Sequence, residues 1–181
     1  MIVLVVGPSG VGKSSTCELA ARHFPQVVFR DLDGLAARCG FEMGIIQEVR
    51  ASLLFGKIGP ERYLEVGLQS INKLAAEFSN QHLVIDVGAG FQVAPSAIKL
   101  HLQYPIIAIT ASLRAAHQRI VLNRGDKRSM DHYKQFEFSP HRIAVYDSAR
   151  HKIDTTSATP EQTRVEFMRI LDLLLMSQLP R

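Results

Sequence analysis

Short runs of consecutive apolar residues alternate along this chain with longer stretches in which apolar positions repeat at helical spacing. The first run, Ile2 to Val6, is wholly aliphatic, which is typical of a strand buried on both faces of a parallel sheet. Further runs predict strands at 27–29, 82–87, 105–110 and, from a weaker pattern, 151–154. Helices are predicted at about 12–24, 33–55, 60–79, 95–102, 112–122, 140–150 and 160–176. The alternation predicts an α/β protein whose parallel sheet is covered by helices on both faces.

One segment, residues 123–137, departs from this alternation. It holds almost no aliphatic side chains and carries four basic residues, Arg124, Lys127, Arg128 and Lys134. We expect such a segment to add little to the core and to be exposed and mobile. Its place after the fourth predicted strand and the following helix favours a lid over a ligand, although the basic residues could equally be the solvated face of a loop.

Composition and charge narrow the class of protein. The 181 residues are 46% hydrophobic and 21% charged, which is ordinary for one globular domain, so we expect a single domain over 1–181. The net charge of +4 suits an anionic ligand. The basic residues are scattered without an aromatic-flanked stripe, which argues against nucleic-acid binding. Cys17 and Cys39 lack CxxC spacing and therefore indicate neither a disulfide framework nor a zinc site.

The apolar runs are also too short for a membrane protein. None approaches the roughly 18 residues that span a bilayer, and the first run lacks the charged leader of a signal peptide. We expect a cytoplasmic protein that does not contact membranes, and no feature of the sequence indicates an obligate protein partner.

The segment GPSGVGKS, residues 7–14, matches the Walker A pattern GxxxxGK[ST] between a buried strand and a helix. In such a loop, glycines let successive N–H groups turn inward toward phosphates, a lysine reaches the β- and γ-phosphates, and a hydroxyl binds Mg²⁺. Lys13 and Ser14 fill the last two roles here. The expected nucleotide-binding residues are Gly10, Val11, Gly12, Lys13, Ser14 and Ser15. ATP is favoured over GTP because the chain has no NKxD motif; the alternative is a glycine-rich turn that binds nothing.

Two aspartates follow the second predicted strand in the segment RDLDG, residues 30–34. If the segment is extended, Asp31 and Asp33 point to the same side, outside the carboxyl end of the sheet, where α/β proteins bind ligands. We predict that Asp31 holds Mg²⁺ through water and that Asp33 binds an acceptor hydroxyl and takes its proton. Alternatively, Asp33 only caps a helix that starts near Gly34. Asp86, at the end of the third strand, could support Mg²⁺ or be merely structural.

Five segments in this order resemble shikimate kinases, which belong to the nucleoside-monophosphate-kinase-like P-loop fold. They are GPSGVGKSS, RDLDG, VIDVGAG, a basic lid after SLRAAHQR, and RIAVYDSARHKIDT, and together they span nearly the whole chain. The resemblance implies a three-layer αβα fold with a five-stranded parallel sheet in the order 2-3-1-4-5 and a mobile lid at about 123–137. It also implies an acceptor-binding helical segment at about 33–67 and the use of ATP and Mg²⁺.

The same resemblance suggests roles for individual residues. Asp33 would bind an acceptor diol, and the turn formed by Gly88, Ala89 and Gly90 would pack against it. Arg142 would bind an acceptor carboxylate, Arg124 would be the catalytic lid arginine near the γ-phosphate, and Arg119 would lie near adenine. Lys13, Asp33 and Arg124 are therefore the expected catalytic residues.

The chain departs from that family in the segment GPERYLEVG, which starts at Gly59. The family has GExxFRxxE there, and Leu64 replaces the arginine that clamps the acceptor carboxylate. Arg62 lies two residues earlier and would face the opposite side of a helix, about 200° away. Ala89 adds a methyl group to a turn that is GGG in the family. We therefore predict an ATP-dependent kinase for a hydroxyl of a small metabolite, shikimate or a related cyclitol or polyol. The alternatives are a diverged nucleotide-binding regulatory protein and a kinase for a nucleotide or an antibiotic.

Overall fold

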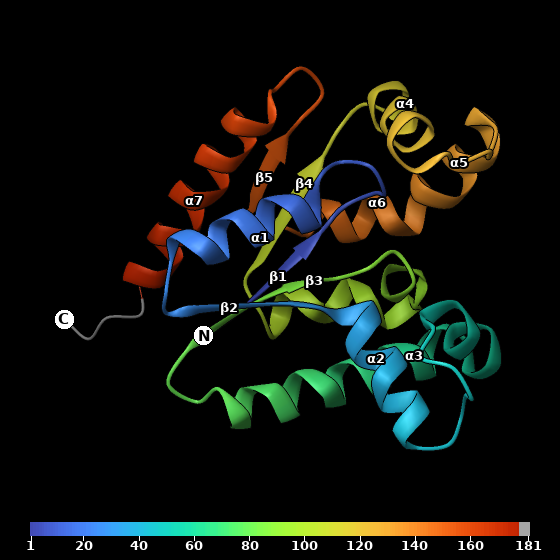
Figure 1. Ribbon diagram of the computed structural model, residues 1–181. Coiled ribbons are helices and arrows are strands. Elements are labelled where there is room, and N and C mark those ends of the chain that lie inside the picture. The colour runs from blue at the N-terminus through green and yellow to red at the C-terminus, as the bar shows by residue number, and fades with distance from the viewer. Residues whose placement is uncertain (178–181) are drawn as a thin grey trace.

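The computed structural model describes residues 1–177. In this part of the chain, five strands form one sheet with the order β2-β3-β1-β4-β5. All of its neighbouring strands are parallel. The strands are β1 (Ile2–Val6), β2 (Val27–Asp31), β3 (His82–Asp86), β4 (Ile106–Thr110) and β5 (His151–Asp154). The predicted sheet, including the order 2-3-1-4-5, is confirmed (Figure 1).

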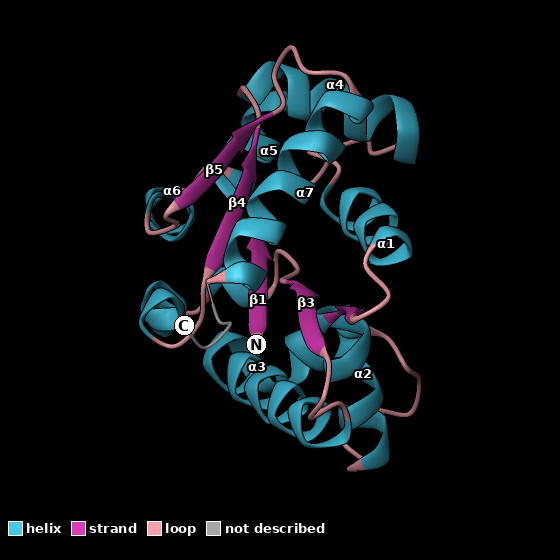
Figure 2. Cartoon of the chain, turned by 90° about the vertical axis from the view of Figure 1, so that its left-hand side faces the viewer, coloured by secondary structure: helices cyan, strands magenta, loops and turns pink. Residues whose placement is uncertain are grey.

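Helices cover both faces of this sheet. They are α1 (Lys13–His23), α2 (Leu32–Glu42), α3 (Ala51–Glu77), α4 (Leu113–Arg124), α5 (Met130–Glu137), α6 (Pro140–Asp147) and α7 (Pro160–Met176), with short 3₁₀ helices at Phe91–Val93 and Pro95–Leu102. Leu4 and Val6 of β1 pack into a core with α2, α3 and α6. Val3 and Val5, which point the other way, pack into a second core with α1, α4, α5 and α7. The three-layer αβα arrangement follows from this alternation along a fully buried strand (Figure 2).

The helical region between β2 and β3 is divided differently from the prediction. The predicted helix over 33–55 ends as α2 at Glu42 and is followed by a turn in which Gly44 has a φ of 70°. The next helix, α3, runs to Glu77 but is kinked at Gly59, which has a φ of 73°. Pro60 follows the kink, and because proline disfavours a helical conformation in the preceding residue, the kink falls at Gly59.

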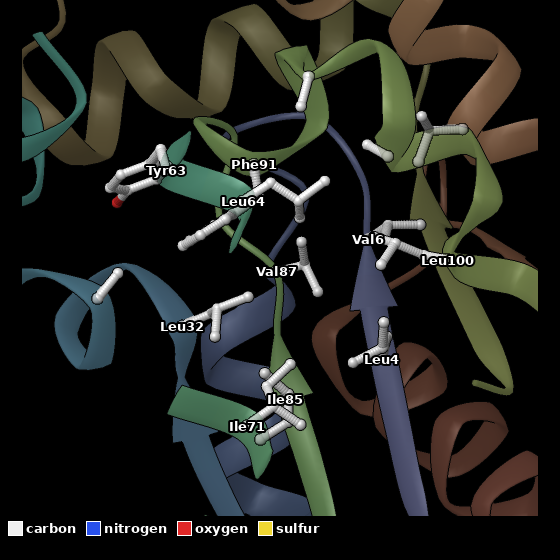
Figure 3. Close-up of a cluster of buried hydrophobic side chains, with 14 of the residues drawn as sticks. Leu4, Val6, Leu32, Tyr63, Leu64, Ile71, Ile85, Val87, Phe91 and Leu100 are labelled. Carbon is white, nitrogen blue, oxygen red and sulfur yellow. The ribbon is translucent and has the colours of Figure 1, made fainter. Parts of the chain in front are cut away.

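Leu64 lies just beyond this kink and belongs to the core. Its side chain is 3% exposed and packs in the same cluster as Val87 and Phe91 (Figure 3). Gly67, one turn later, allows this packing, because a Cβ there would lie 2.4 Å from the ring of Phe91. The position that would hold a clamp arginine therefore serves here as part of the apolar packing between α3 and the segment after β3.

The segment 123–137 is only partly as predicted. Its second half forms α5, capped by the Ser129 hydroxyl, which accepts a hydrogen bond from the N–H of His132 at 3.2 Å. Tyr133 is 0% exposed and Glu137 1% exposed, so the expectation that the whole segment is exposed and adds little to the core is wrong. An aromatic ring and a buried ion pair supply the packing that the missing aliphatic residues do not. Among residues 1–177, no helix is both long and apolar enough to span a bilayer.

Candidate functional site

The loop between β1 and α1 has the tight conformation that its glycines allow. Gly7, Gly10 and Gly12 all have positive φ angles, of 146°, 85° and 91°. The loop also packs closely, since a Cβ on Gly7 would lie 1.9 Å from the carbonyl oxygen of Ile109, and one on Gly10 would lie 2.7 Å from that of Ala116. The conformation disfavours side chains at all three positions, and the packing excludes them at Gly7 and Gly10.

Lys13, the first residue of α1, folds back into this loop. Its Nζ donates hydrogen bonds to the carbonyl oxygens of Gly7 at 3.0 Å and Pro8 at 3.2 Å. The side chain is 9% exposed, so the ammonium group is held in the curl of the loop and beside the N-terminus of α1. A phosphate would meet a fixed positive charge together with the backbone N–H groups of a helix N-terminus at this point.

Asp86 and Ser14 form a pair at the carboxyl end of β3. The Ser14 hydroxyl donates to Oδ2 of Asp86 at 2.6 Å, and Oδ1 of Asp86 is buried with no hydrogen-bond partner among residues 1–177. The register places Asp86 beside Asp31 of β2 and Val5 of β1. A buried carboxylate oxygen without a partner is available to bind a ligand. A hydroxyl beside a carboxylate suits a hard divalent cation.

The prediction that Asp31 and Asp33 of RDLDG form an extended pair is wrong. Because α2 begins at Leu32, Asp33 lies in the first turn of the helix, and Asp31 is the N-cap, whose Oδ2 accepts a hydrogen bond from the N–H of Gly34 at 2.8 Å. The alternative in which Asp33 is the cap is therefore also wrong. The Asp31 carboxylate is engaged in capping α2, whereas the Asp33 carboxylate points toward the segment after β3.

Asp33 is held by two neighbours that lie far away in the sequence. Its Oδ1 accepts a hydrogen bond from the Tyr63 hydroxyl at 2.7 Å. A Cβ on Gly88 would lie 1.8 Å from its Oδ2, so the turn at 88–90 does pack against Asp33, and only glycine leaves the necessary space. Burial raises the pKa of Asp33, and the charges of Asp31 and Asp86 raise it further, although the Tyr63 hydrogen bond opposes the shift. Sequence reasoning missed Tyr63, because nothing local links it to a carboxylate 30 residues away.

A cavity of about 290 Å³ brings most of the predicted site residues together. Its lining includes the predicted residues Gly10, Gly12, Lys13, Ser14, Ser15, Asp31, Asp33, Gly88 and Ala89, and adds Ser9 and Asp86. Gly90 lies outside the lining and instead makes room for Tyr63, whose ring would lie 3.0 Å from a Cβ at that position. The cavity therefore places an aspartate with a raised pKa within the same space as the phosphate loop.

A second cavity, of about 340 Å³, lies on the other side of the same loop. Gly10, Gly12 and Ser15 line both cavities, and Val11 and Arg119 line only this one. Arg119 is fixed there by a hydrogen bond of 2.8 Å to the Thr155 hydroxyl. Its lining is more apolar than that of the first cavity, which suits a nucleotide base, and the place of Arg119 near adenine stays a prediction.

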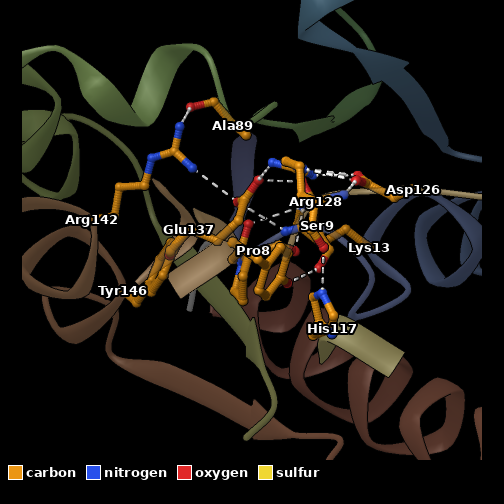
Figure 4. A network of polar contacts seen from close by, with 12 residues as sticks. Pro8, Ser9, Lys13, Ala89, His117, Asp126, Arg128, Glu137, Arg142 and Tyr146 are labelled. Atoms are coloured by element: carbon orange, nitrogen blue, oxygen red, sulfur yellow. Dashed lines mark hydrogen bonds and ion pairs between the residues drawn. The ribbon is translucent and has the colours of Figure 1, made fainter. Parts of the chain in front are cut away.

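Arg142 has a different environment from the one expected. Its side chain is 1% exposed and does not line the cavity. Its Nη1 is 2.9 Å from Oε2 of Glu137, and its Nη2 donates to the carbonyl oxygen of Ala89 at 2.8 Å (Figure 4). The arginine expected to take an acceptor carboxylate is thus already paired with a carboxylate of the chain itself.

Glu137 continues this network to the phosphate loop. Its carboxylate accepts hydrogen bonds from the N–H of Ser9 at 3.1 Å and from the Ser9 hydroxyl at 2.8 Å, and Arg128 lies 3.5 Å away (Figure 4). No local pattern indicates this residue, because its partner Ser9 lies 128 positions away. Two further expectations concern arginines. Arg62 is 52% exposed and pairs with Glu65, as its helical position indicated, and the side chain of Arg124 lies outside what the structure describes.

The sheet order and the glycine-rich loop between β1 and α1 show that this chain has a P-loop kinase fold. Among solved structures, it is similar to shikimate kinase from Bacteroides thetaiotaomicron, with a TM-score of 0.70, 17% identity, and coverage of 97% of this chain and 98% of that one. Shikimate kinase from Acinetobacter baumannii in complex with shikimate gives a TM-score of 0.64, 17% identity, and coverage of 99% and 95%. Shikimate kinase from Aquifex aeolicus gives a TM-score of 0.64 and 18% identity, and the match covers 97% of this chain and 99% of that one. Neither a protein-family model nor a curated protein sequence matches the chain. The fold is therefore shikimate kinase-like.

Proposed function

We propose that this protein is an ATP-dependent kinase that transfers the γ-phosphoryl group to a hydroxyl of a small metabolite, a cyclitol or polyol related to shikimate. The observation that carries the proposal is the single cavity lined by Asp33, Lys13 and Ser14. A base and a phosphate-binding loop in one cavity are what a P-loop kinase needs, which supports the proposal. The shikimate kinase-like fold supports the same class of reaction.

Each part of the nucleotide has residues suited to it. The backbone N–H groups of the loop and Lys13 would bind the phosphates, and the cavity beside Arg119 would take the base. Ser14 and Asp86 fit a magnesium ion, because Oδ1 of Asp86 has no hydrogen-bond partner in the described part of the chain, and Asp31 could reach the ion through water. When bound, Mg²⁺ would offset negative charge on the phosphates.

Asp33 would act as the base. As the acceptor oxygen bonds to the γ-phosphorus and the bond to the leaving oxygen of ADP breaks, Oδ2 of Asp33 would take the hydroxyl proton. The Tyr63 hydrogen bond holds the carboxylate in one orientation, and burial raises its pKa, which makes it a better proton acceptor than an exposed aspartate. Lys13 and, as proposed, Arg124 from the lid would stabilise the charge on the transferred group.

The test is acceptor-dependent release of ADP. Purified protein with ATP and Mg²⁺ is supplied in turn with shikimate, other cyclitols, gluconate, nucleoside monophosphates and aminoglycosides. We expect one of the hydroxylated metabolites to raise ADP release well above the rate with water. We also expect Asp33→Asn to abolish this increase while ATP binding stays near that of the wild type. Near wild-type turnover in Asp33→Asn would remove the base assignment.

A second candidate function is a nucleotide-binding regulatory protein that has lost catalysis. It is favoured by two observations: Leu64 stands in the core in place of a clamp arginine, and Arg142 is held by Glu137. Tight ATP binding without acceptor-dependent ADP release from any member of the panel would favour this function over the kinase.

A further inference from the structure

The charges around the acceptor side of the cavity are predominantly negative. Asp31, Asp33 and Asp86 all line it, and within residues 1–177 the lining contains one basic side chain, Lys13. Lys13 is turned into the phosphate loop by its bonds to Gly7 and Pro8, so its charge serves the nucleotide side. An acceptor carboxylate entering beside Asp33 would meet a like charge, and among the described side chains, which do not include that of Arg124, the lining offers it no unengaged cation. Such an arrangement is costly in a desolvated space.

Arg142 comes nearest to supplying that cation. It lies directly behind the cavity wall, because its Nη2 bonds to the carbonyl oxygen of Ala89, which lines the cavity. Its guanidinium, however, is 1% exposed and paired with Glu137, whose side chain is also 1% exposed. Glu137 is anchored in turn by the N–H and hydroxyl of Ser9. Ser9 therefore holds the Glu137 carboxylate against Arg142, and the guanidinium is already paired before any acceptor carboxylate could reach it.

Two further basic residues, both on α3, are also engaged. Arg62 pairs with Glu65 at the surface, and Lys57 donates to the carbonyl oxygen of Ile45 at 2.6 Å. Leu64 is buried in the core.

We infer that the acceptor of this kinase carries no carboxylate, and that Glu137 is a specificity-determining residue because it neutralises Arg142 behind the acceptor site. The substrate class is then a neutral polyol, or a polyol with an amino group, whose ammonium would be attracted by Asp33, the aspartate that the proposed magnesium site leaves to the acceptor. Glu137 is a positioning residue and does not contact the acceptor. The inference rests on the proposed kinase function and narrows its substrate.

The test compares acceptors that differ only in the carboxylate. Shikimate, its carboxamide, myo-inositol and an aminocyclitol are assayed for ADP release, and the binding of shikimate and of the carboxamide is titrated in the presence of Mg²⁺ and a non-hydrolysable ATP analogue. We expect kcat/KM for the carboxamide to exceed that for shikimate by about tenfold or more, and its binding to be tighter. Shikimate binding or reacting as well as its carboxamide would overturn the inference while leaving the kinase function standing. Absence of ADP release with every probe would overturn the proposed function, and the inference with it.

A variant then tests the role of Glu137. Glu137→Gln keeps the size and one acceptor oxygen, which can still face Arg142 and the Ser9 N–H, while its NH2 group can donate to the Ser9 hydroxyl. It removes the charge that neutralises Arg142, so the preference for the carboxamide over shikimate should shrink by about tenfold. Adding Arg142→Met should remove this shift. Glu166→Gln, on the surface of α7 where Glu166 pairs with Arg169, is the matched control and should leave the ratio unchanged. An unchanged ratio in folded Glu137→Gln would refute the role of Glu137, and if the variant does not fold, the ratio measured on the wild type decides the inference.

Discussion

Gly88→Ala tests whether the close packing of the 88–90 turn on Asp33 sets the geometry of the proposed base. The added Cβ would lie 1.8 Å from Oδ2 of Asp33, 2.3 Å from its Cγ and 2.7 Å from its Oδ1. Ordinary contact begins at 3.4 Å, so the carboxylate would have to retreat by about 1.6 Å. The retreat would also stretch the hydrogen bond from Tyr63, which is 2.7 Å long.

The expected effect is large on turnover and small on nucleotide binding. A displacement of about 1 Å at a reacting group can cost about 100-fold, so we expect kcat to fall by at least about 100-fold. Overpacking typically costs about 1–3 kcal/mol, which a domain with an unfolding free energy of about 5–15 kcal/mol tolerates. ATP affinity should be retained, because the added methyl group meets Asp33 and not the phosphate loop.

The assay measures kcat with the best acceptor found, ATP affinity by fluorescence titration with a labelled ATP analogue, and the thermal unfolding midpoint. Gly56→Ala is the matched control: its Cβ would have no atom within 4 Å, and it lies inside α3, where alanine should stabilise the helix by about 0.8–1 kcal/mol. A folded Gly88→Ala protein with the kcat of the wild type would show that the position of Asp33 against this turn does not matter for the reaction.

Three more predictions concern neighbours of the site. Burial raises the pKa of Asp33, so kcat/KM should fall with decreasing pH at a pH above the ordinary range of aspartate. Tyr63→Phe removes the hydrogen bond that lowers this pKa and should move the fall to still higher pH; an unmoved pH–rate profile would contradict the role of Tyr63. Asp86→Asn should raise the Mg²⁺ concentration needed for ATP binding by about tenfold or more, as read from Mg²⁺ titrations, and an unaltered Mg²⁺ requirement would remove Asp86 from the metal site. Glu137→Ala leaves Arg142 buried without its carboxylate partner and should lower the free energy of unfolding, measured in urea, by about 3–5 kcal/mol. Replacing both Glu137 and Arg142 by methionine should recover most of this loss, and an equal loss in the double variant would contradict this account.

The features that could be predicted from the sequence are those encoded locally. The β1 strand and the loop that follows are contiguous, and their pattern alone indicates both the buried strand and the phosphate-binding turn. The start of α7 can be predicted in the same way, since Thr159 and Gln162 have the spacing of a capping box and form one in the structure. Asp86 could be recognised as a candidate because strand ends in a parallel sheet share one edge, but its unpartnered oxygen could be seen only in three dimensions.

The features that escaped prediction depend on contacts between distant segments or on a shift of one residue. The roles of Asp31 and Asp33 changed because α2 begins at Leu32, directly after β2, and such boundaries are weakly encoded. Tyr63 and Glu137 gain their roles from partners 30 and 128 positions away, and nothing in the sequence around either residue points to that partner. The polar composition of 123–137 suggested an exposed lid, yet a buried ion pair can fill interior space as well as aliphatic side chains can.

The contacts of Ser9 limit how this protein can be recombined with its structural neighbours. Its N–H and hydroxyl are bound by Glu137, and its carbonyl oxygen accepts a hydrogen bond from the Tyr133 hydroxyl, so α5 satisfies every polar group of this one loop residue. A transplanted lid without a tyrosine and a glutamate at these two positions would leave these groups without their partners. The phosphate loop and α5 therefore form one exchangeable unit despite their separation in the chain, and positions 9, 133 and 137 are expected to change together among relatives of this protein.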